Sequence, residues 1–351
     1  MNNREKKIRI FKLFSQNLEW VKEHKEINFI PDFTNGYICP ICFNVFFEQD
    51  LESSVPNPLT LEDVPPASLG GKPLTLTCRS CNSKNGHELD VHLLNILLEN
   101  DSKLFLPNSK SKASFEVSGN KVNGSFDIDS NGTANLRIEP QISHPDQYRN
   151  FVKKMEQTTI TKYSPLFHQE KLFSEEIRTP EFTMNFQRVY NERRAEIALL
   201  RVAYLIAYAN LGNGFLMNPG LYKVREQILN PDKEILSKVF WIRHQFPKEM
   251  EGINIISQPK ELQCFLIVFN LKTNSKSTQY AIALPGPSKP SIEVYDYIEK
   301  YLCVGDGTEM FNFTAEHIMS RAYLKTRDYA FASHLFWQRY THPDYKPNFP
   351  K

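Results

Sequence analysis

Two Cys-x-x-Cys pairs constrain the fold of this chain more than any other feature. Cys39 and Cys42 form the first pair, Cys78 and Cys81 form the second, and 35 residues lie between them. A two-residue spacer lets both sulfurs of a pair face one ion, and four thiolates close a tetrahedral Zn²⁺ site without an open position. We therefore expect structural zinc at these four residues.

The same cysteines also indicate in which cellular compartment the protein is found. The chain has six cysteines in 351 residues, and no apolar segment typical of an export signal follows its basic N-terminal residues. The longest apolar stretch, 195–212, is interrupted by Arg201, which favours a buried core helix over a membrane span. We expect a cytoplasmic protein, because paired cysteines in a reducing compartment bind metal more often than they form disulfides.

Apolar periodicity predicts an α+β fold in four successive segments. We expect a basic amphipathic helix within 1–30, a zinc-stapled unit of two strands and a helix at 31–103, an antiparallel β meander at 104–145, and a mixed, mainly helical domain at 146–351. Gly86 is expected to break the chain before the helix of the zinc unit. In the last segment we expect helices over 186–211, 221–229 and 315–325, and a hairpin of buried strands between the last two.

Net charge gives no general argument for nucleic acid, because it is only +2. The first 25 residues are more basic, with seven Lys or Arg against three Glu. They form either a solvated helix face or an arm that contacts phosphates.

The motif "CPIC…LTLEDVPPASLGG…LTCRSCNSKNG" resembles the zinc-stapled HNH endonucleases with their ββα-metal site. The resemblance covers about residues 37–95. It implies that Glu62 and Asn82 bind a catalytic Mg²⁺ or Mn²⁺ ion, which stabilises charge on the phosphodiester. The chain departs from the family at two positions: Asp63 stands where the general-base histidine is expected, and Pro73 replaces an asparagine.

The base therefore has several candidates. Asp63 is either the base itself, with a pKa raised by Glu62, or a further metal ligand. His87 is the preferred alternative, because Asp90 at i+3 can orient its imidazole, and His92 is another candidate base or ligand. Surface or capping roles explain both histidines equally well. Lys72, Arg79 and Lys84 are candidates for binding the nucleic-acid backbone, or are simply solvated loop charges.

The resemblance implies a metal-dependent endonuclease that hydrolyses DNA, expected to be duplex, in phage defence or mobile-element biology. The alternative is a zinc-stapled module that has lost its base and binds nucleic acid or a partner protein. In a third interpretation the function lies in the C-terminal domain, 146–351. We expect this domain to have a sensing, targeting or oligomerising role, and to form a homo-oligomer or bind a regulatory partner. The last interpretation remains open because 146–351 presents no recognisable chemistry.

Overall fold

The protein forms two compact units in the computed structural model. The structure describes residues 2–24, 27, 29–138, 145–155, 182–186, 188–236, 241–242, 246–286, 293–302, 313–318 and 320–330. Unit 1 comprises residues 1–94, 191–272 and 277–351, and unit 2 comprises 95–190 and 273–276. This division differs from the four successive segments expected from sequence, because the first and last parts of the chain belong to one unit.

The N-terminal part of unit 1 has the predicted order of strand, strand and helix. Helix α1 (Asn3–Lys22) packs against the antiparallel pair of β3 (Leu59–Val64) and β4 (Lys72–Cys78), while β1 (Tyr37–Ile38) and β2 (Val45–Phe46) form a short hairpin. Helix α2 (Arg79–Asn85) follows β4 directly and continues through a π-helical turn, η3 (Gly86–Asp90), into α3 (Val91–Lys103). The expected break at Gly86 is wrong, because this residue has right-handed helical geometry (φ −58°, ψ −43°).

A turn between β3 and β4 depends on two glycines. Gly70 has φ +87°, a conformation that favours glycine, and a Cβ on Gly71 would lie 1.5 Å from the carbonyl oxygen of Pro65. The prolines that end β3 and the Gly-Gly turn that precedes β4 therefore fix how the two strands meet.

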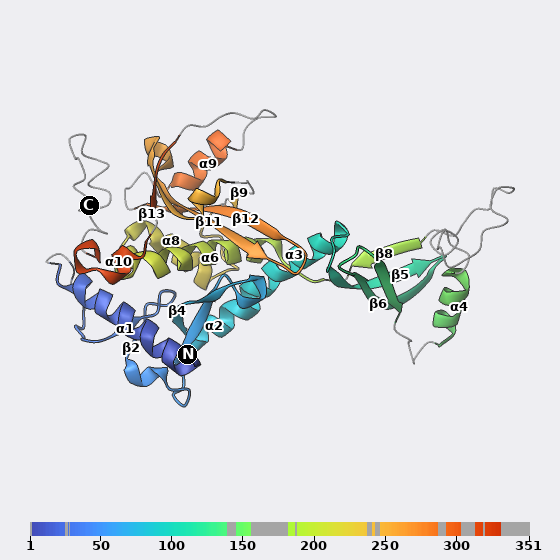
Figure 1. Cartoon of the computed structure of the whole chain (residues 1–351), viewed down its shortest axis with the longest axis horizontal. Helices are drawn as coiled ribbons and strands as arrows, with labels where there is room; N and C mark the ends of the chain where they lie inside the picture. Colours follow the sequence, from blue (N-terminus) through green and yellow to red (C-terminus); the bar gives the residue numbers. More distant parts are fainter. Residues whose placement is uncertain are drawn as a thin grey trace. The chain divides into compact units, whose positions relative to one another are not determined.

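The long helix α6 (Glu192–Leu211) forms the centre of unit 1. It contacts β3 and β4 as well as β11 (Cys264–Lys272) and β12 (Ser277–Pro285), so the N-terminal and C-terminal parts share one core (Figure 1). Most of its side chains are buried all round the helix, which is typical of a core helix. Shorter helices of this part of unit 1 include α7 (Asn213–Leu216), α8 (Tyr222–Leu229) and α9 (Val294–Leu302).

The sheet beside α6 has five strands in the order β13-β10-β11-β12-β9. Its remaining strands are β9 (Trp241–Ile242), β10 (Gly252–Gln258) and β13 (Thr314–Ile318). The expected helix over 315–325 is wrong: Thr314–Ile318 is paired with β10, and only Ala322–Lys325 (α10) is helical. Edge pairing with β10 satisfies backbone groups that a helix would satisfy internally. The predicted hairpin of β11 and β12 is confirmed.

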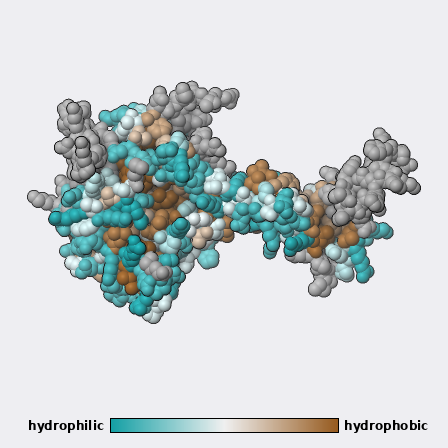
Figure 2. Space-filling view, viewed as in Figure 1, coloured by the Kyte–Doolittle hydropathy of each residue, from teal (hydrophilic) through white to brown (hydrophobic). Residues whose placement is uncertain are grey.

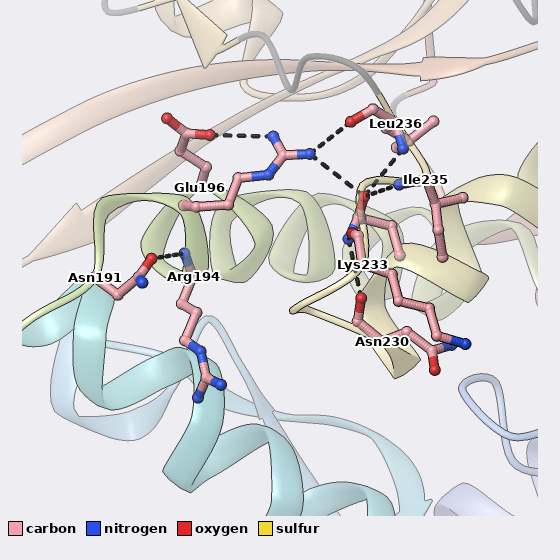
Figure 3. Close-up of polar contacts among 9 residues, drawn as sticks. Asn191, Arg194, Glu196, Asn230, Lys233, Ile235 and Leu236 are labelled. Carbon is pink, nitrogen blue, oxygen red and sulfur yellow. Dashed lines mark hydrogen bonds and ion pairs between the residues drawn. The ribbon is translucent and has the colours of Figure 1, made fainter.

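A buried glutamine on α8 holds the N-terminal end of α6. Figure 3 shows polar contacts at this end of the helix, among them that of Asn191 with Arg194. Gln227 is fully buried; its Oε1 accepts from the backbone of Ile235 and Leu236, and from Arg193 of α6 at 3.3 Å. Arg193 also donates to the carbonyl of Leu236 at 2.6 Å, and the side chain of Asn191 caps the helix by accepting from the backbone of Arg194 at 3.0 Å. These contacts fix the position of α6 and of the side chains it carries.

Unit 2 contains the predicted meander. Its sheet has the order β7-β6-β5-β8, formed by β5 (Lys110–Val117), β6 (Asn120–Ile128), β7 (Ala134–Ile138) and β8 (Phe182–Phe186). Helix α4 (Pro145–Met155) buries Phe151 in the apolar cluster of this sheet, which includes Phe115 and Phe126. The fourth strand, β8, was not expected from sequence.

On the face shown in Figure 2, hydrophilic residues cover most of unit 1, and hydrophobic residues are visible between them. Within the part of the chain that the structure describes, no helix combines the length and apolar content needed to cross a membrane. In its described residues the chain has an α+β architecture of small antiparallel sheets and helices.

Candidate metal centre

The four cysteines converge on one point. Their sulfur atoms all lie within 4.8 Å of one another, and the Sγ atoms of Cys42 and Cys78 are 3.8 Å apart. A tetrahedron with Zn–S bonds of about 2.3 Å has S–S edges of about 3.8 Å. Burial raises the pKa of the Cys39 thiol, so a cation is needed to hold this sulfur as a thiolate at neutral pH. The four residues are therefore placed to hold a metal ion such as zinc.

Local backbone geometry and α6 both support this cluster. Cys39 exchanges backbone hydrogen bonds with the turn after it, donating to Asn44 and accepting from Phe43, which has φ +64°. From α6, the Tyr204 hydroxyl donates to the carbonyl of Pro40 at 2.7 Å. The first cysteine pair is thus held by a helix that begins about 150 residues later in the chain.

Glu62, an expected ligand of the catalytic ion, is buried and already has two partners. It is 3% exposed; its carboxylate accepts from the Thr77 hydroxyl at 2.5 Å on β4 and forms an ion pair with Arg201 of α6. A divalent ion at Glu62 would have to replace or repel this guanidinium.

Arg201 joins two carboxylates inside the protein. It is 1% exposed, and its Nη1 lies 3.0 Å from each carboxylate oxygen of Asp90, while Nη2 contacts Glu62. Burial acts to lower the pKa of Arg201, but the charges of Glu62 and Asp90 outweigh it and raise that pKa. We call Glu62, Asp90 and Arg201 the buried charge cluster. Its carboxylates are compensated by a protein side chain.

Asp63 is placed differently from its neighbour. A β-bulge lies between Glu62 and Asp63, and Asp63 is paired with Pro73 rather than with a residue in regular register. Asp63 is half-buried; burial and the charge of Glu62 raise its pKa, and Lys6 of α1 opposes this shift. Burial is the largest cause of this rise in the Asp63 pKa, followed by the charge of Glu62.

Asn82, the other expected ligand of the catalytic ion, lies beside β3, the strand that carries Glu62. Asn82 donates from its amide nitrogen to Thr60 Oγ1 and to the carbonyl of Leu61, at 3.0 and 3.1 Å. In the described residues, the four cysteines form the one group of three or more His, Cys, Asp or Glu side chains able to hold a metal.

The two histidines have separate positions. His87 is exposed on η3. Its expected partner Asp90 instead accepts from Arg201, so the predicted orientation of His87 by Asp90 is wrong. His92 accepts at Nδ1 from the backbone of Asn191 at 3.1 Å, beside the start of α6. Burial, helped by the charge of Arg194, lowers the pKa of His92 and favours the neutral ring that this bond requires. His92 thus has a capping role.

Basic and aromatic side chains surround the metal centre. Arg79 and Lys84 are exposed on α2; Lys84 also donates to the carbonyl of Leu229 at 2.8 Å, at the end of α8. The guanidinium of Arg225 on α8 lies 3.5 Å from the ring centre of Phe43 and 5.4 Å from that of Tyr222, which is 54% exposed. We call Phe43, Arg79, Lys84, Tyr222 and Arg225 the metal-centre surface. The third predicted basic residue, Lys72, is exposed at the start of β4.

Arg201 is the site residue that sequence reasoning did not identify as functional. An arginine in an otherwise apolar helix implies a buried acidic partner, and this was the available indication. No protein-family model, curated protein or solved structure matches this chain.

Proposed function

We propose that this chain is a DNA-binding protein built on a ββα module that a structural Zn²⁺ ion stabilises, and that Arg201 replaces the catalytic divalent ion of the HNH nucleases it resembles. The zinc ion bound by Cys39, Cys42, Cys78 and Cys81 has no open coordination position. It supplies stability and no chemistry. The proposed binding face is the metal-centre surface.

The observation that carries this proposal is the ion pair of Glu62 with Arg201. The guanidinium is a buried cation that donates hydrogen bonds to both Glu62 and Asp90. Arg201 and Thr77 already occupy the carboxylate oxygens of Glu62, and Arg201 occupies those of Asp90, so a divalent ion would have to displace these contacts to bind. Glu62 therefore serves to hold α6 against the ββα module, and nucleophile activation has no metal to act through.

The outer surface supplies features that suit a polyanion. Arg79 directly follows the ligand Cys78, and Lys84 lies on the same helix, so their charges reach solvent beside the metal centre. Such cations bind phosphates and release counterions. The exposed ring of Tyr222, next to Arg225, offers a stacking face for an unpaired base. Both kinds of contact are independent of sequence, so we expect little sequence preference.

A second candidate is a metal-dependent nuclease that hydrolyses DNA, and two observations favour it. Asn82 uses its amide nitrogen for two hydrogen bonds and leaves its oxygen without a hydrogen-bond donor among the described residues. Asp63 is half-buried with a raised pKa, which suits a proton acceptor better than an ordinary aspartate does. In this candidate, Glu62 must exchange Arg201 for Mg²⁺ or Mn²⁺ when DNA binds.

One set of variants tests binding. Fluorescence anisotropy with labelled duplex and single-stranded DNA, over a range of salt, is expected to show binding that weakens with salt. Arg79→Gln should lower affinity for both DNAs and reduce the salt slope by about 1. Tyr222→Ala should lower affinity for the single strand by about tenfold or more. Arg149→Gln, an exposed arginine of α4 in unit 2, is the charge-matched control. Absence of binding by folded, zinc-loaded protein contradicts the proposal.

A second assay separates binding from cleavage. Supercoiled plasmid is incubated with wild-type protein, Asn82→Ala or Asp63→Ala, with Mg²⁺ or Mn²⁺ and with EDTA. The binding proposal predicts no nicking with any metal. Metal-dependent nicking that Asn82→Ala abolishes would establish the nuclease instead, and loss of nicking in Asp63→Ala would identify its base. Asp63→His, which restores the usual base of the HNH pattern, is expected to remain inactive as long as Arg201 is present.

A further inference from the structure

One of the four cysteines of the metal centre reaches solvent. Cys39, Cys78 and Cys81 are 0%, 1% and 7% exposed, whereas Cys42 is only half-buried. The Sγ atom of Cys42 lies 3.8 Å from that of Cys78. A small oxidant that approaches this centre from solvent therefore meets Cys42 first and finds a second sulfur beside it.

Each of these two cysteines is followed directly by a residue of the metal-centre surface: Phe43 follows Cys42, and Arg79 follows Cys78. Phe43 has a left-handed φ of +64°, which a bulky residue rarely adopts, and its backbone N–H donates to the carbonyl of the first cysteine of its pair. This turn places the Phe43 ring 3.5 Å from the guanidinium of Arg225. The shape of the metal-centre surface therefore depends on the state of the sulfurs.

We propose that the metal centre is a redox switch, in which a hydroperoxide oxidises Cys42 and Cys78 to a disulfide and the zinc ion is released. The Cys42 thiolate attacks the O–O bond of hydrogen peroxide, becomes a sulfenic acid and sets free hydroxide. The Cys78 thiolate then attacks the sulfenic sulfur, so that the S–S bond forms and a second hydroxide leaves. The two thiolates lose two electrons, and the peroxide gains them.

Oxidation of this pair also changes the surface that surrounds the centre. It removes two of the four zinc ligands, and the remaining pair, Cys39 and Cys81, is too small a ligand set for a structural zinc ion. Without the ion, the turn at Phe43 loses the constraint that keeps it in left-handed geometry, and its ring leaves Arg225. DNA binding should therefore weaken on oxidation and recover after reduction with added Zn²⁺. This last effect rests on the proposed function, whereas the release of zinc does not.

Treatment of the full-length, zinc-loaded protein with hydrogen peroxide tests the switch. A colorimetric zinc indicator should show that peroxide releases the ion, and a thiol reductant with added Zn²⁺ should restore the metal content. Digestion with trypsin and Glu-C places Cys42 on peptide 27–48 and Cys78 on peptide 63–79. Mass spectrometry without reduction should find these two peptides linked, and fragmentation should locate the bond between Cys42 and Cys78.

Histidine variants separate the reacting cysteine from the other ligands. A site of three cysteines and one histidine also holds structural zinc, so a change from Cys to His removes one thiol and keeps a ligand. Cys42→His removes the attacking thiolate, and peroxide should release its zinc at least about tenfold more slowly than in wild type. Cys81→His is the matched control: it keeps both reacting sulfurs and should release zinc as wild type does. Cys264→Ser, a buried cysteine outside the centre, should also behave as wild type.

The proposal is overturned if peroxide leaves the zinc bound, if the disulfide joins another pair of cysteines, or if Cys42→His and wild type release zinc equally fast. If Cys42→His takes up no zinc, the linked peptides of wild type decide. Zinc release without loss of DNA binding overturns the effect on the metal-centre surface. A protein that binds no DNA in either state overturns the proposed function, and zinc release and the disulfide then decide the switch by themselves.

Discussion

Replacement of Arg201 by methionine is the most direct test of the buried charge cluster. Methionine has a similar length and is apolar, so the variant removes the cation and leaves the carboxylates of Glu62 and Asp90 facing each other without compensation. Arg201 contacts Asp90 through two hydrogen bonds of 3.0 Å from one nitrogen and contacts Glu62 through the other. The cluster therefore contains two charge-assisted contacts, one to each carboxylate.

The magnitude follows from these contacts. A hydrogen bond to a charged group contributes about 1.5–3 kcal/mol, so two such contacts give roughly 3–6 kcal/mol. Removal of one partner from a buried ion pair typically costs about 3–5 kcal/mol, because the other charge stays buried. We expect Arg201→Met to lower the free energy of unfolding at pH 7 by about 3–5 kcal/mol, measured by urea denaturation of zinc-loaded protein.

The loss should depend on pH in a defined direction. Burial raises the pKa of Asp90, and Arg201 opposes this shift, so the variant raises the pKa further. A carboxyl group such as Asp90, whose pKa is higher in the folded than in the unfolded protein, favours folding most when it is protonated. This contribution is fully present below the unfolded pKa of about 4 and is lost as pH rises through the folded pKa. The deficit of Arg201→Met relative to wild type should therefore shrink as pH falls from 7 toward 4.

Two further variants make this test specific. The first is Arg194→Met. Arg194 lies on the same helix, but its ion-pair partner Asp232 is at the surface, with its side chain 77% exposed. This variant should cost less than about 1 kcal/mol. Combining Glu62→Gln and Asp90→Asn with Arg201→Met removes all three charges and should recover part of the loss. Equal effects of Arg201→Met and Arg194→Met, or a loss that does not change with pH, would refute the reasoning.

Four more predictions concern the metal centre, two glycines and Asp63. Cys78→Ser should abolish stoichiometric zinc, measured by elemental analysis, and lower the melting temperature as EDTA does to wild type; retention of zinc would contradict a four-thiolate site. Gly71→Ala should cost about 1–3 kcal/mol, since its Cβ would meet the Pro65 carbonyl. By contrast, Gly86→Ala, with open space around a helical glycine, should gain about 0.5–1 kcal/mol in urea denaturation. Asp63→Asn should be more stable than wild type at pH 7 and equal to it at pH 3, because the raised pKa of Asp63 means that its charged form is disfavoured.

Local patterns of the sequence determined much of this fold. The spacing of the four cysteines predicted their convergence, because two residues between ligands constrain each pair regardless of the rest of the chain. The strand, strand and helix around them and the hairpin of β11 and β12 followed from apolar periodicity and from punctuation by Pro and Gly. In these cases the pattern is short: a Cys-x-x-Cys turn, or two strands that follow one another closely along the chain.

The tertiary structure decided what the sequence left open. Thr314–Ile318 is a strand because β10 offers an edge to pair with, and Glu62 is an ion-pair partner because Arg201 reaches it from 139 residues away. Neither partner is set by local spacing: the chain between them is long, so many pairings were compatible with the sequence. Burial is the physical reason. A buried carboxylate such as that of Glu62 needs a cation as its partner, which could be a metal ion or a basic side chain. The packing of α6 against β3 determined that this cation is Arg201.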